Sequence, residues 1–140
     1  MPIQDYDNIR AVEWSDNGLK LLDQRLLPRL EQWLTFSDAL GVAQAIRDMV
    51  VRGAPAIGIT AAYGVVLAAQ QRYEESSEHW QTLIEEDFKV LAESRPTAVN
   101  LFWALDRMKA VLAGLAGNPV ASLLTEARLI HEEDIAANLR

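Results

Sequence analysis

The sequence predicts an α+β fold that is mainly α, with a small N-terminal antiparallel β-sheet of two or three strands followed by about five helices. Two observations predict this fold class. A turn signal separates two short apolar segments near the N-terminus, and apolar residues recur at helical spacing after residue 36. At 140 residues the chain is expected to form one domain. Its β-sheet subregion is predicted at residues 1–36 and its helical subregion at residues 37–140.

A β-hairpin is predicted around Asp16, Asn17 and Gly18, because glycine tolerates the positive φ that tight hairpin turns need. The apolar residues on either side are Ile9, Val12 and Trp14 before the turn, and Leu19, Leu21 and Leu22 after it. Residues 32–36 predict a third short strand, although a helix is an alternative there.

The first predicted helix begins after Ser37, whose hydroxyl can cap it. Its apolar face would contain Leu40, Ala43, Ile46 and Val50. The second predicted helix runs from Pro55 to about residue 73. Small side chains fall on one of its faces, which predicts the central helix of the bundle; they are Ala54, Gly58, Ala61, Val65 and Ala68.

A third helix is predicted after Ser76 or Ser77, either of which can act as its cap. Its apolar face comprises Trp80, Leu83, Ile84, Phe88 and Leu91. The segment SRPT, residues 94–97, ends this helix because Pro96 cannot continue it. A fourth helix follows, with Leu101, Leu105, Met108, Leu112 and Leu115 on one face. A last helix is expected to start at Asn118 and Pro119 and to continue towards Arg140.

Composition excludes several classes of function. The formal net charge of −7 argues against sequence-independent nucleic-acid binding. The longest apolar stretch, residues 54–69, is shorter than the roughly 20 residues of a membrane-spanning helix, so no membrane partner is expected. There is no cysteine, and His79 and His131 do not show metal-ligand spacing, so no metal site is predicted. The N-terminus lacks a signal-peptide pattern, and a cytoplasmic location is expected.

The start of the second helix is a candidate anion-binding site. Pro55 suits the first helical position, and Ala54 would then be a cap without a side-chain oxygen. The amides of Ala56, Ile57 and Gly58 would lack a local acceptor and would carry the positive end of the helix dipole. With Arg52 and Gly53 just upstream, these amides form a plausible phosphate cradle.

Two ordinary explanations for Arg52 remain open at this point: it pairs with Asp48, or it only meets solvent. The SRPT segment repeats the arrangement, with Arg95 ahead of a proline and a helix start. Here Thr97 is a possible cap, which would leave less room for an anion.

Other polar and aromatic residues are weaker candidates. Asp23, Gln24 and Arg25 form either a polar cluster or, as the sequence favours, a solvated turn. Asp106 and Arg107 are expected on a helix surface, and His131 on an exposed polar face. The four tryptophans are expected to be core anchors; they are Trp14, Trp33, Trp80 and Trp103.

Three segments resemble the methylthioribose-1-phosphate isomerases of methionine salvage. They are VEW…LLDQRLLP, AIRDMVVRGAPAIGITAAYGVVLAA and SRPTAVNLFWALDRM, which extend from about Val12 to Met108. The superfamily also contains ribose-1,5-bisphosphate isomerase and regulatory subunits of a translation-initiation exchange factor. The resemblance implies that Arg52, Gly53 and Ala54 bind the sugar phosphate and that Arg95 also binds substrate.

The resemblance implies an aldose–ketose isomerase that acts on 5-methylthioribose 1-phosphate without a cofactor, as a homodimer. In that family the catalytic thiol and aspartate belong to a C-terminal Rossmann-like domain, so no catalytic residue is expected in this chain. The last helical pattern continues to Arg140 without a stop signal, and we expect the chain to be an N-terminal domain that is inactive alone.

Two alternatives remain open. The chain could be a protein-interaction module of the translation-regulatory branch, or part of an isomerase for another ribose 1-phosphate derivative. In the latter case the pocket for the 5-substituent determines which ribose 1-phosphate derivative is the substrate. Possible lining residues of this pocket are Trp33, Phe36 and Trp103.

Overall fold

The computed structural model describes residues 10–138 and begins with a three-stranded antiparallel sheet. Its strands, in sheet order, are β1 (Val12–Ser15), β2 (Gly18–Leu22) and β3 (Trp33–Phe36). The predicted N-terminal sheet is therefore confirmed, including its third strand, and the helical alternative for that strand is wrong. Ile9 lies outside the described residues.

The hairpin between β1 and β2 depends on Gly18. Its φ is +130°, and a Cβ atom at this position would lie 2.3 Å from the backbone oxygen of Phe36. Only glycine fits both the dihedral angle and this close approach to β3. The register places Val12 opposite Leu21 and Trp14 opposite Leu19, which turns the apolar residues of both strands towards the same face.

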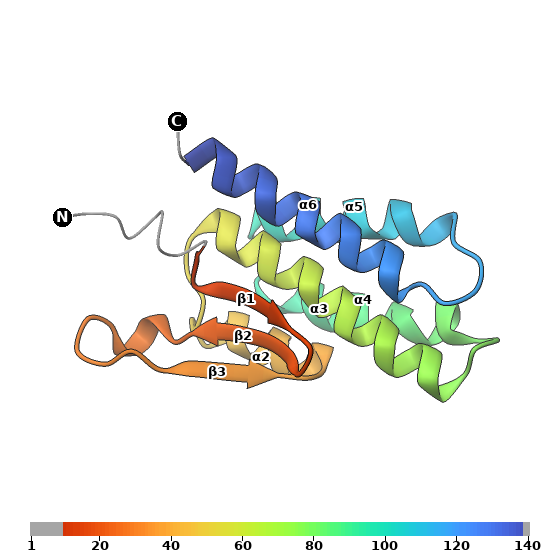
Figure 1. The fold of residues 1–140 in the computed structure, drawn as a ribbon, viewed down its shortest axis with the longest axis horizontal. Coiled ribbons are helices and arrows are strands. Elements are labelled where there is room, and N and C mark those ends of the chain that lie inside the picture. The colour runs from red at the N-terminus through yellow and green to blue at the C-terminus, as the bar shows by residue number, and fades with distance from the viewer. Residues whose placement is uncertain (1–9, 139–140) are drawn as a thin grey trace.

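Helices occupy the rest of the described chain, as Figure 1 shows. They are α2 (Ala39–Arg47), α3 (Ala54–Glu75), α4 (Trp80–Ser94), α5 (Val99–Ala113) and α6 (Val120–Asn138), preceded by a 3₁₀ turn, η1 (Gln24–Leu26). The α+β, mainly α, fold class is confirmed.

The central position predicted for the second helix is confirmed by α3. All residues from 56 to 69 are buried, and α3 packs against α2, α4, α5 and α6 as well as against the sheet. On the sheet side, the rings of Trp14 and Tyr63 stack with their centroids 5.5 Å apart. The small residues of α3 allow these neighbours to approach closely on several sides.

The start of α2 differs from the prediction by one residue. Asp38, not Ser37, is the cap, and its Oδ1 accepts a hydrogen bond of 2.7 Å from the amide of Gly41. The carboxylate also interacts favourably with the positive end of the helix dipole. Leu40, predicted on the apolar face, is 67% exposed. The buried face of α2 consists instead of Ala39, Val42, Ala43, Ala45 and Ile46.

The cap of α4 is also corrected. His79 occupies the cap position without a side-chain hydrogen bond, whereas neither Ser76 nor Ser77 caps this helix. Ser76 is the C-terminal cap residue of α3, and its hydroxyl accepts a 3.0 Å hydrogen bond from the amide of His79. The serine therefore stabilises the turn between α3 and α4 and does not cap α4 itself. The end of α4 at Ser94 is as predicted.

The predicted packing of α5 and the predicted start of α6 are confirmed. Leu101, Leu105 and Met108 of α5 are buried. At the start of α6, the side-chain oxygen of Asn118 accepts a 3.0 Å hydrogen bond from the amide of Val120. Residues 139–140 of the last predicted helix lie outside the described residues.

Only part of the tryptophan prediction holds. Trp80 is buried, with 4% exposure, and Trp14 packs against the core. Trp33 and Trp103 are 40% and 50% exposed, so they are not core anchors. Burial alternates along β3: Leu34 and Phe36 pack against the core, and Trp33 lies on the opposite, exposed face of the strand. Trp103 lies on the face of α5 that borders a surface hollow.

Candidate functional site

The helix that carries the candidate anion site begins one residue earlier than predicted. Gly53 is the cap, with φ 91° and ψ 135°, and Ala54 is already the first residue of α3. The cap position therefore requires positive φ, which glycine adopts without strain. Like the alanine predicted there, Gly53 makes no side-chain hydrogen bond to the helix.

This shift changes which amides face outward. The amide of Ile57 donates to the backbone oxygen of Gly53 at 3.0 Å, and that of Gly58 lies one residue further into the helix. The prediction that both would lack an acceptor is wrong. The amides of Ala54 and Ala56 precede the first intrahelical bond, and Pro55 has no amide hydrogen. Two donors and the positive end of a 22-residue helix remain.

Arg52 is exposed and makes no ion pair with Asp48. Both carboxylate oxygens of Asp48 instead accept from Nε2 of Gln44, at 3.0 Å each. Across residues 10–138, the guanidinium of Arg52 has neither a hydrogen bond nor an ion pair. The ion-pair alternative is therefore wrong, and the charge of Arg52 faces solvent beside the start of α3.

The segment before Arg52 is held by the residues after β2. The amide of Gln24 donates to the backbone oxygen of Val50 at 2.9 Å. Asp23 and Gln24 are buried, so the favoured solvated turn is wrong and the polar-cluster alternative is correct. Asp23 accepts from Nε of Arg25 at 2.9 Å and from its Nη2 at 2.8 Å. These hydrogen bonds from Arg25 lower the pKa of the Asp23 carboxyl.

Arg95 lies at the corresponding turn between α4 and α5. It directly follows the last residue of α4 and is half-buried. Its backbone oxygen accepts a 3.0 Å hydrogen bond from the amide of Ala98. Ala98 caps α5 without a side-chain hydrogen bond. Thr97 is therefore not the cap, and the predicted competition with an anion does not exist. In the described part of the chain, the Arg95 guanidinium has no hydrogen-bonding partner.

The two helix starts lie against one another. A Cβ atom on Gly58 would be 2.9 Å from the backbone oxygen of Asn100, so the first turns of α3 and α5 are in contact. Figure 1 shows both starts at the end of the molecule that also holds the C-terminal end of α6. The turns that carry Arg52 and Arg95 therefore belong to one end of the helical layer.

A surface hollow of about 310 Å³ opens at this end, between α3, α5 and α6. It is lined by Pro55, Gly58, Val99, Asn100, Trp103, Ile130 and Asp134. Burial, and then the charge of Glu133, raise the pKa of the Asp134 carboxyl. Of the three aromatic residues expected around such a pocket, Trp103 lines it, whereas Trp33 and Phe36 lie on β3 and do not.

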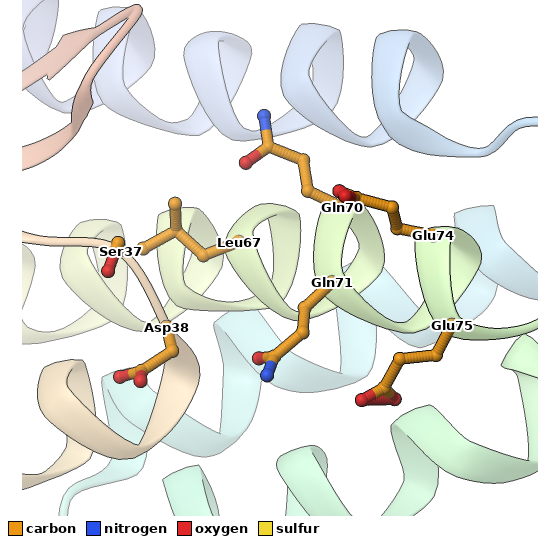
Figure 2. A pocket seen from close by; sticks show the side chains of 7 residues that line it. All are labelled: Ser37, Asp38, Leu67, Gln70, Gln71, Glu74 and Glu75. Carbon is orange, nitrogen blue, oxygen red and sulfur yellow. The ribbon is translucent and has the colours of Figure 1, made fainter.

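A larger hollow, of about 530 Å³, lies along the second half of α3. In Figure 2 the side chains of Gln71 and Glu75 extend from α3 on the side that faces Asp38, at the start of α2. Glu74 adds a third carboxylate to the lining. Because like charges repel, this acidic hollow is unsuited to a phosphate, and the smaller hollow beside the α3 start is the better candidate.

His131 and Arg107 are less exposed than the sequence suggests. His131 is half-buried, and its Nδ1 lies 2.8 Å from the hydroxyl of Tyr63. Arg107 connects α5 to Glu126 and Glu133 of α6. The predicted exposed position of His131 is wrong, because α6 packs across α3 and α5. Asp106 is exposed on α5 as predicted, whereas Arg107 is half-buried and paired.

Among residues 10–138, no group of histidine, cysteine, aspartate or glutamate side chains is arranged to hold a metal ion. No helix within that same range has both the length and the apolar character needed to cross a bilayer.

A sequence model of the initiation factor 2 subunit family matches residues 50–139. The match includes every residue proposed above for anion binding: Arg52, Gly53, Ala54 and Arg95. The chain belongs to the initiation factor 2 subunit family.

Curated relatives in this family are named methylthioribose-1-phosphate isomerase. That of Azotobacter vinelandii is 60% identical over 135 residues, which cover 95% of this chain and 37% of the relative. That of Methylococcus capsulatus is 58% identical over 131 residues, which cover 94% of this chain and 37% of the relative. The chain thus spans little more than a third of these enzymes.

Two solved structures from the family share the fold. The 5-methylthioribose 1-phosphate isomerase from Pyrococcus horikoshii has a TM-score of 0.84 and 36% identity, and the match covers 99% of this chain and 42% of that chain. Translation initiation factor eIF-2B, subunit delta, from A. fulgidus has a TM-score of 0.81 and 38% identity, covering 89% of this chain and 37% of that one. An enzyme and a translation factor share this fold, so the function has to be inferred from the residues of the site and not from the fold.

Proposed function

We propose that this chain is the substrate-clamping N-terminal part of an isomerase that converts 5-methylthioribose 1-phosphate to 5-methylthioribulose 1-phosphate in methionine salvage. The observation that carries the proposal is a pair of arginines, Arg52 and Arg95, beside adjoining helix starts, whose guanidinium groups have no partner among residues 10–138. The names of the relatives at 56–60% identity supply the substrate.

In this proposal the phosphate sits at the start of α3. The amides of Ala54 and Ala56 donate to its oxygens, and the helix dipole and Arg52 supply positive charge. Gly53 has no side chain to obstruct the approach. Arg95 provides a second cation from the start of α5. An anion held from two sides in this way is fixed in orientation as well as in position.

The reaction itself is an internal rearrangement. The sugar ring opens, and hydrogen moves from C2 to C1 so that an aldose becomes a ketose with the same atoms. No external oxidant or reductant is consumed. We assign orientation and the exclusion of water to this chain. We assign the groups that move protons to a Rossmann-like domain of the longer protein.

A second candidate function is supported by the A. fulgidus structure, which is a translation factor subunit at 38% identity. In that case the chain would be a protein-interaction module and would bind no sugar phosphate. The isomerase proposal is preferred because the isomerase relatives are 56–60% identical. Both functions are compatible with the fold, and they differ in what they require of Arg52.

A chimeric enzyme tests the proposal. This chain replaces the matching 135-residue segment of the A. vinelandii enzyme, and turnover of 5-methylthioribose 1-phosphate is measured. We expect activity in the chimera and a loss of about 10- to 100-fold in kcat/KM for Arg52→Ala, since a hydrogen bond to a charged group contributes about 1.5–3 kcal/mol. The matched control is Arg128→Ala, which removes an exposed arginine of α6.

The isolated chain provides an independent measurement. Inorganic phosphate should shift the backbone amide resonances of Ala54 and Ala56 in NMR spectra, and Arg52→Ala should weaken that titration. A folded chimera without turnover, or an Arg52→Ala variant that matches the control in both assays, would contradict the proposal.

A further inference from the structure

The 3₁₀ turn η1, which follows β2, is held in shape by a pair between its cap residue, Asp23, and Arg25. Oδ1 of Asp23 accepts from the amide of Arg25 at 3.0 Å and from its Nε at 2.9 Å, and Oδ2 accepts from Nη2 at 2.8 Å. Asp23 is only 3% exposed, so these donors replace the water that its carboxylate would otherwise bind. A bidentate pair of this kind fixes the geometry of both side chains.

The turn is joined to the segment before Arg52 through the main chain. The amide of Gln24 donates to the backbone oxygen of Val50 at 2.9 Å. The side chain of Gln24 is buried, but its Nε2 has no hydrogen-bond partner within residues 10–138. The link to Val50 therefore depends on the backbone shape of η1, which Asp23 and Arg25 maintain.

The segment that leads to Arg52 needs this link because it contains a strained residue. Met49 has φ 67°, and a non-glycine residue keeps a left-handed conformation only where the surrounding structure holds it. Val50 is held on both sides, since its amide donates to Ala45 at 3.0 Å and its oxygen accepts from Gln24. Without the second bond Met49 could relax, and Arg52, three residues further on, would move with it.

Arg52 lies between two anchored residues. Downstream, the oxygen of Gly53 accepts the amide of Ile57 at 3.0 Å, so α3 itself secures that side. Upstream, the nearest anchored residue is Val50. The position of Arg52 relative to the start of α3 is therefore set by the link from η1.

Arg25 itself is poorly suited to bind the phosphate. The hydrogen bond with Asp23, and to a smaller extent the charge of Asp48, raise the pKa of the Arg25 guanidinium. A phosphate at Arg25 would have to compete with the Asp23 carboxylate, which repels it. Arg52, in contrast, presents its charge to solvent.

We propose that Arg25 is a positioning residue for Arg52. By pairing with Asp23, Arg25 keeps η1 in the shape that presents the amide of Gln24 to Val50, and it thereby fixes the backbone from which Arg52 reaches the phosphate. This inference rests on the proposed function, because that function makes Arg52 a phosphate ligand. It extends the site to a turn of the β2–β3 connection.

The test is an NMR titration of the ¹⁵N-labelled chain with inorganic phosphate. Arg25→Ala should weaken binding about threefold to tenfold, as expected for groups coupled in one hydrogen-bond network. Arg25→Lys keeps the charge but cannot form the bidentate pair, so it should lose most of the same affinity. Arg29→Ala is the matched control, because it removes an exposed arginine of the same connection. Binding by Arg25→Lys as tight as in the wild type would overturn the proposal, since charge alone would then suffice.

A double-mutant cycle separates positioning from other causes. If Arg25 acts through Arg52, Arg25→Ala should change phosphate affinity by at most about twofold once Arg52 is already alanine. A direct contact between Arg25 and phosphate, or a general loss of folded protein, would lower the affinity by the same factor in both backgrounds. That result would overturn the proposal.

Hydrogen exchange gives a measurement that does not depend on phosphate. In Arg25→Ala the amides of Gln24 and Val50 should exchange about tenfold faster, because local opening becomes easier. The amide of Leu67, in the buried part of α3, should be unchanged and so reports that the fold is intact. If Arg25→Ala does not fold, Arg25→Lys carries the same measurements.

The outcomes separate the two proposals. If Arg25→Ala leaves exchange at Val50 or phosphate affinity unchanged, the positioning role is overturned while the phosphate seat stands. If Arg52→Ala binds phosphate as tightly as the wild type, the phosphate seat fails, and the positioning role that depends on it is overturned as well.

Discussion

Gly58 of α3 and the backbone carbonyl of Asn100 in α5 lie in direct contact. A Cβ atom on Gly58 would be 2.9 Å from that oxygen and 3.5 Å from the Cβ of Asn100. The nearest obstacle is thus backbone, which cannot rotate away as the end of a side chain can. This contact sets the distance between the two helix starts that carry Arg52 and Arg95.

Gly58→Ala should therefore destabilise the protein. Alanine gains about 1 kcal/mol in helix propensity, but the clash forces α3 and α5 apart at a cost of about 1–3 kcal/mol. We expect a net loss in the free energy of unfolding, measured by urea denaturation, and weaker phosphate binding. Gly114→Ala is the control, since its nearest atom would be 4.0 Å away. Equal stability of the two variants would show that the contact is not tight.

Met49 ends α2 in a left-handed conformation, with φ 67°. Its amide donates to Ile46 at 3.3 Å, and the next amide, that of Val50, donates to Ala45 at 3.0 Å. This hydrogen-bond pattern normally has glycine at the left-handed position. Met49→Gly should raise the free energy of unfolding by about 1 kcal/mol, because a non-glycine residue is strained there by about 1–2 kcal/mol.

The reverse substitution is available at Gly117, which has φ +75° and open space around its Cα. Gly117→Ala should lower the stability by a similar amount, through backbone strain alone. If Met49→Gly fails to stabilise while Gly117→Ala destabilises, the side chain of Met49 contributes contacts that outweigh its strain.

The sequence was sufficient for the elements but not for their exact starts. Apolar periodicity is a local property, so the hairpin at Gly18 and the long buried helix were predictable from residues close in the chain. The helix caps depend on which oxygen reaches an amide. Asp38 rather than Ser37 makes that contact at α2, and either residue type is a favourable cap.

The candidate site likewise contains residues that the sequence predicts and residues that only the three-dimensional structure identifies. Arg52 and Gly53 adjoin the helix start in sequence, so their arrangement was recognisable. Asn100 and Asp134 were missed because only tertiary packing brings α5 and α6 beside Pro55. The sequence contained only a weak indication that Ile130 and Asp134 line the same hollow: they are four residues apart and therefore share a helix face.

Arg107 links α5 to α6 through two carboxylates. Its Nη1 and Nη2 each donate to Glu133 at 2.9 Å, and its Nε donates to Glu126. Arg107→Ala should lower the free energy of unfolding by about 1–2 kcal/mol at neutral pH. Arg107→Lys should recover part of the loss, because an ammonium group cannot form the same bidentate pair. Arg128→Ala, an exposed arginine of α6, should have little effect.

The effect of Arg107 should depend on pH. Its hydrogen bonds lower the pKa of the Glu133 carboxyl, so the stabilisation is present above the unfolded pKa of glutamate and is lost as pH falls through the lower folded value. Wild type and Arg107→Ala should therefore converge in stability under acidic conditions. A constant difference down to pH 2 would show that Arg107 acts through packing on Trp103, whose ring lies 5.4 Å away, and not through its charge.

Tyr63 and His131 join α3 to α6 by a hydrogen bond between residues 68 positions apart. Burial of the phenol raises the pKa of Tyr63 to about 12, so the hydroxyl is neutral and can donate to Nδ1 of His131. Tyr63→Phe should lower the free energy of unfolding by about 1 kcal/mol at pH 7 through loss of this bond.

At high pH the phenylalanine variant should become more stable than the wild type. An unfolded tyrosine ionises near pH 10, so the contribution of Tyr63 to stability is complete below pH 10 and declines as pH rises to about 12, by about 1.4 kcal/mol per pH unit. The phenylalanine variant lacks this titration. Urea denaturation at pH 7, 10 and 11.5 measures the crossover, and parallel stability profiles for the two proteins would contradict the buried, neutral phenol.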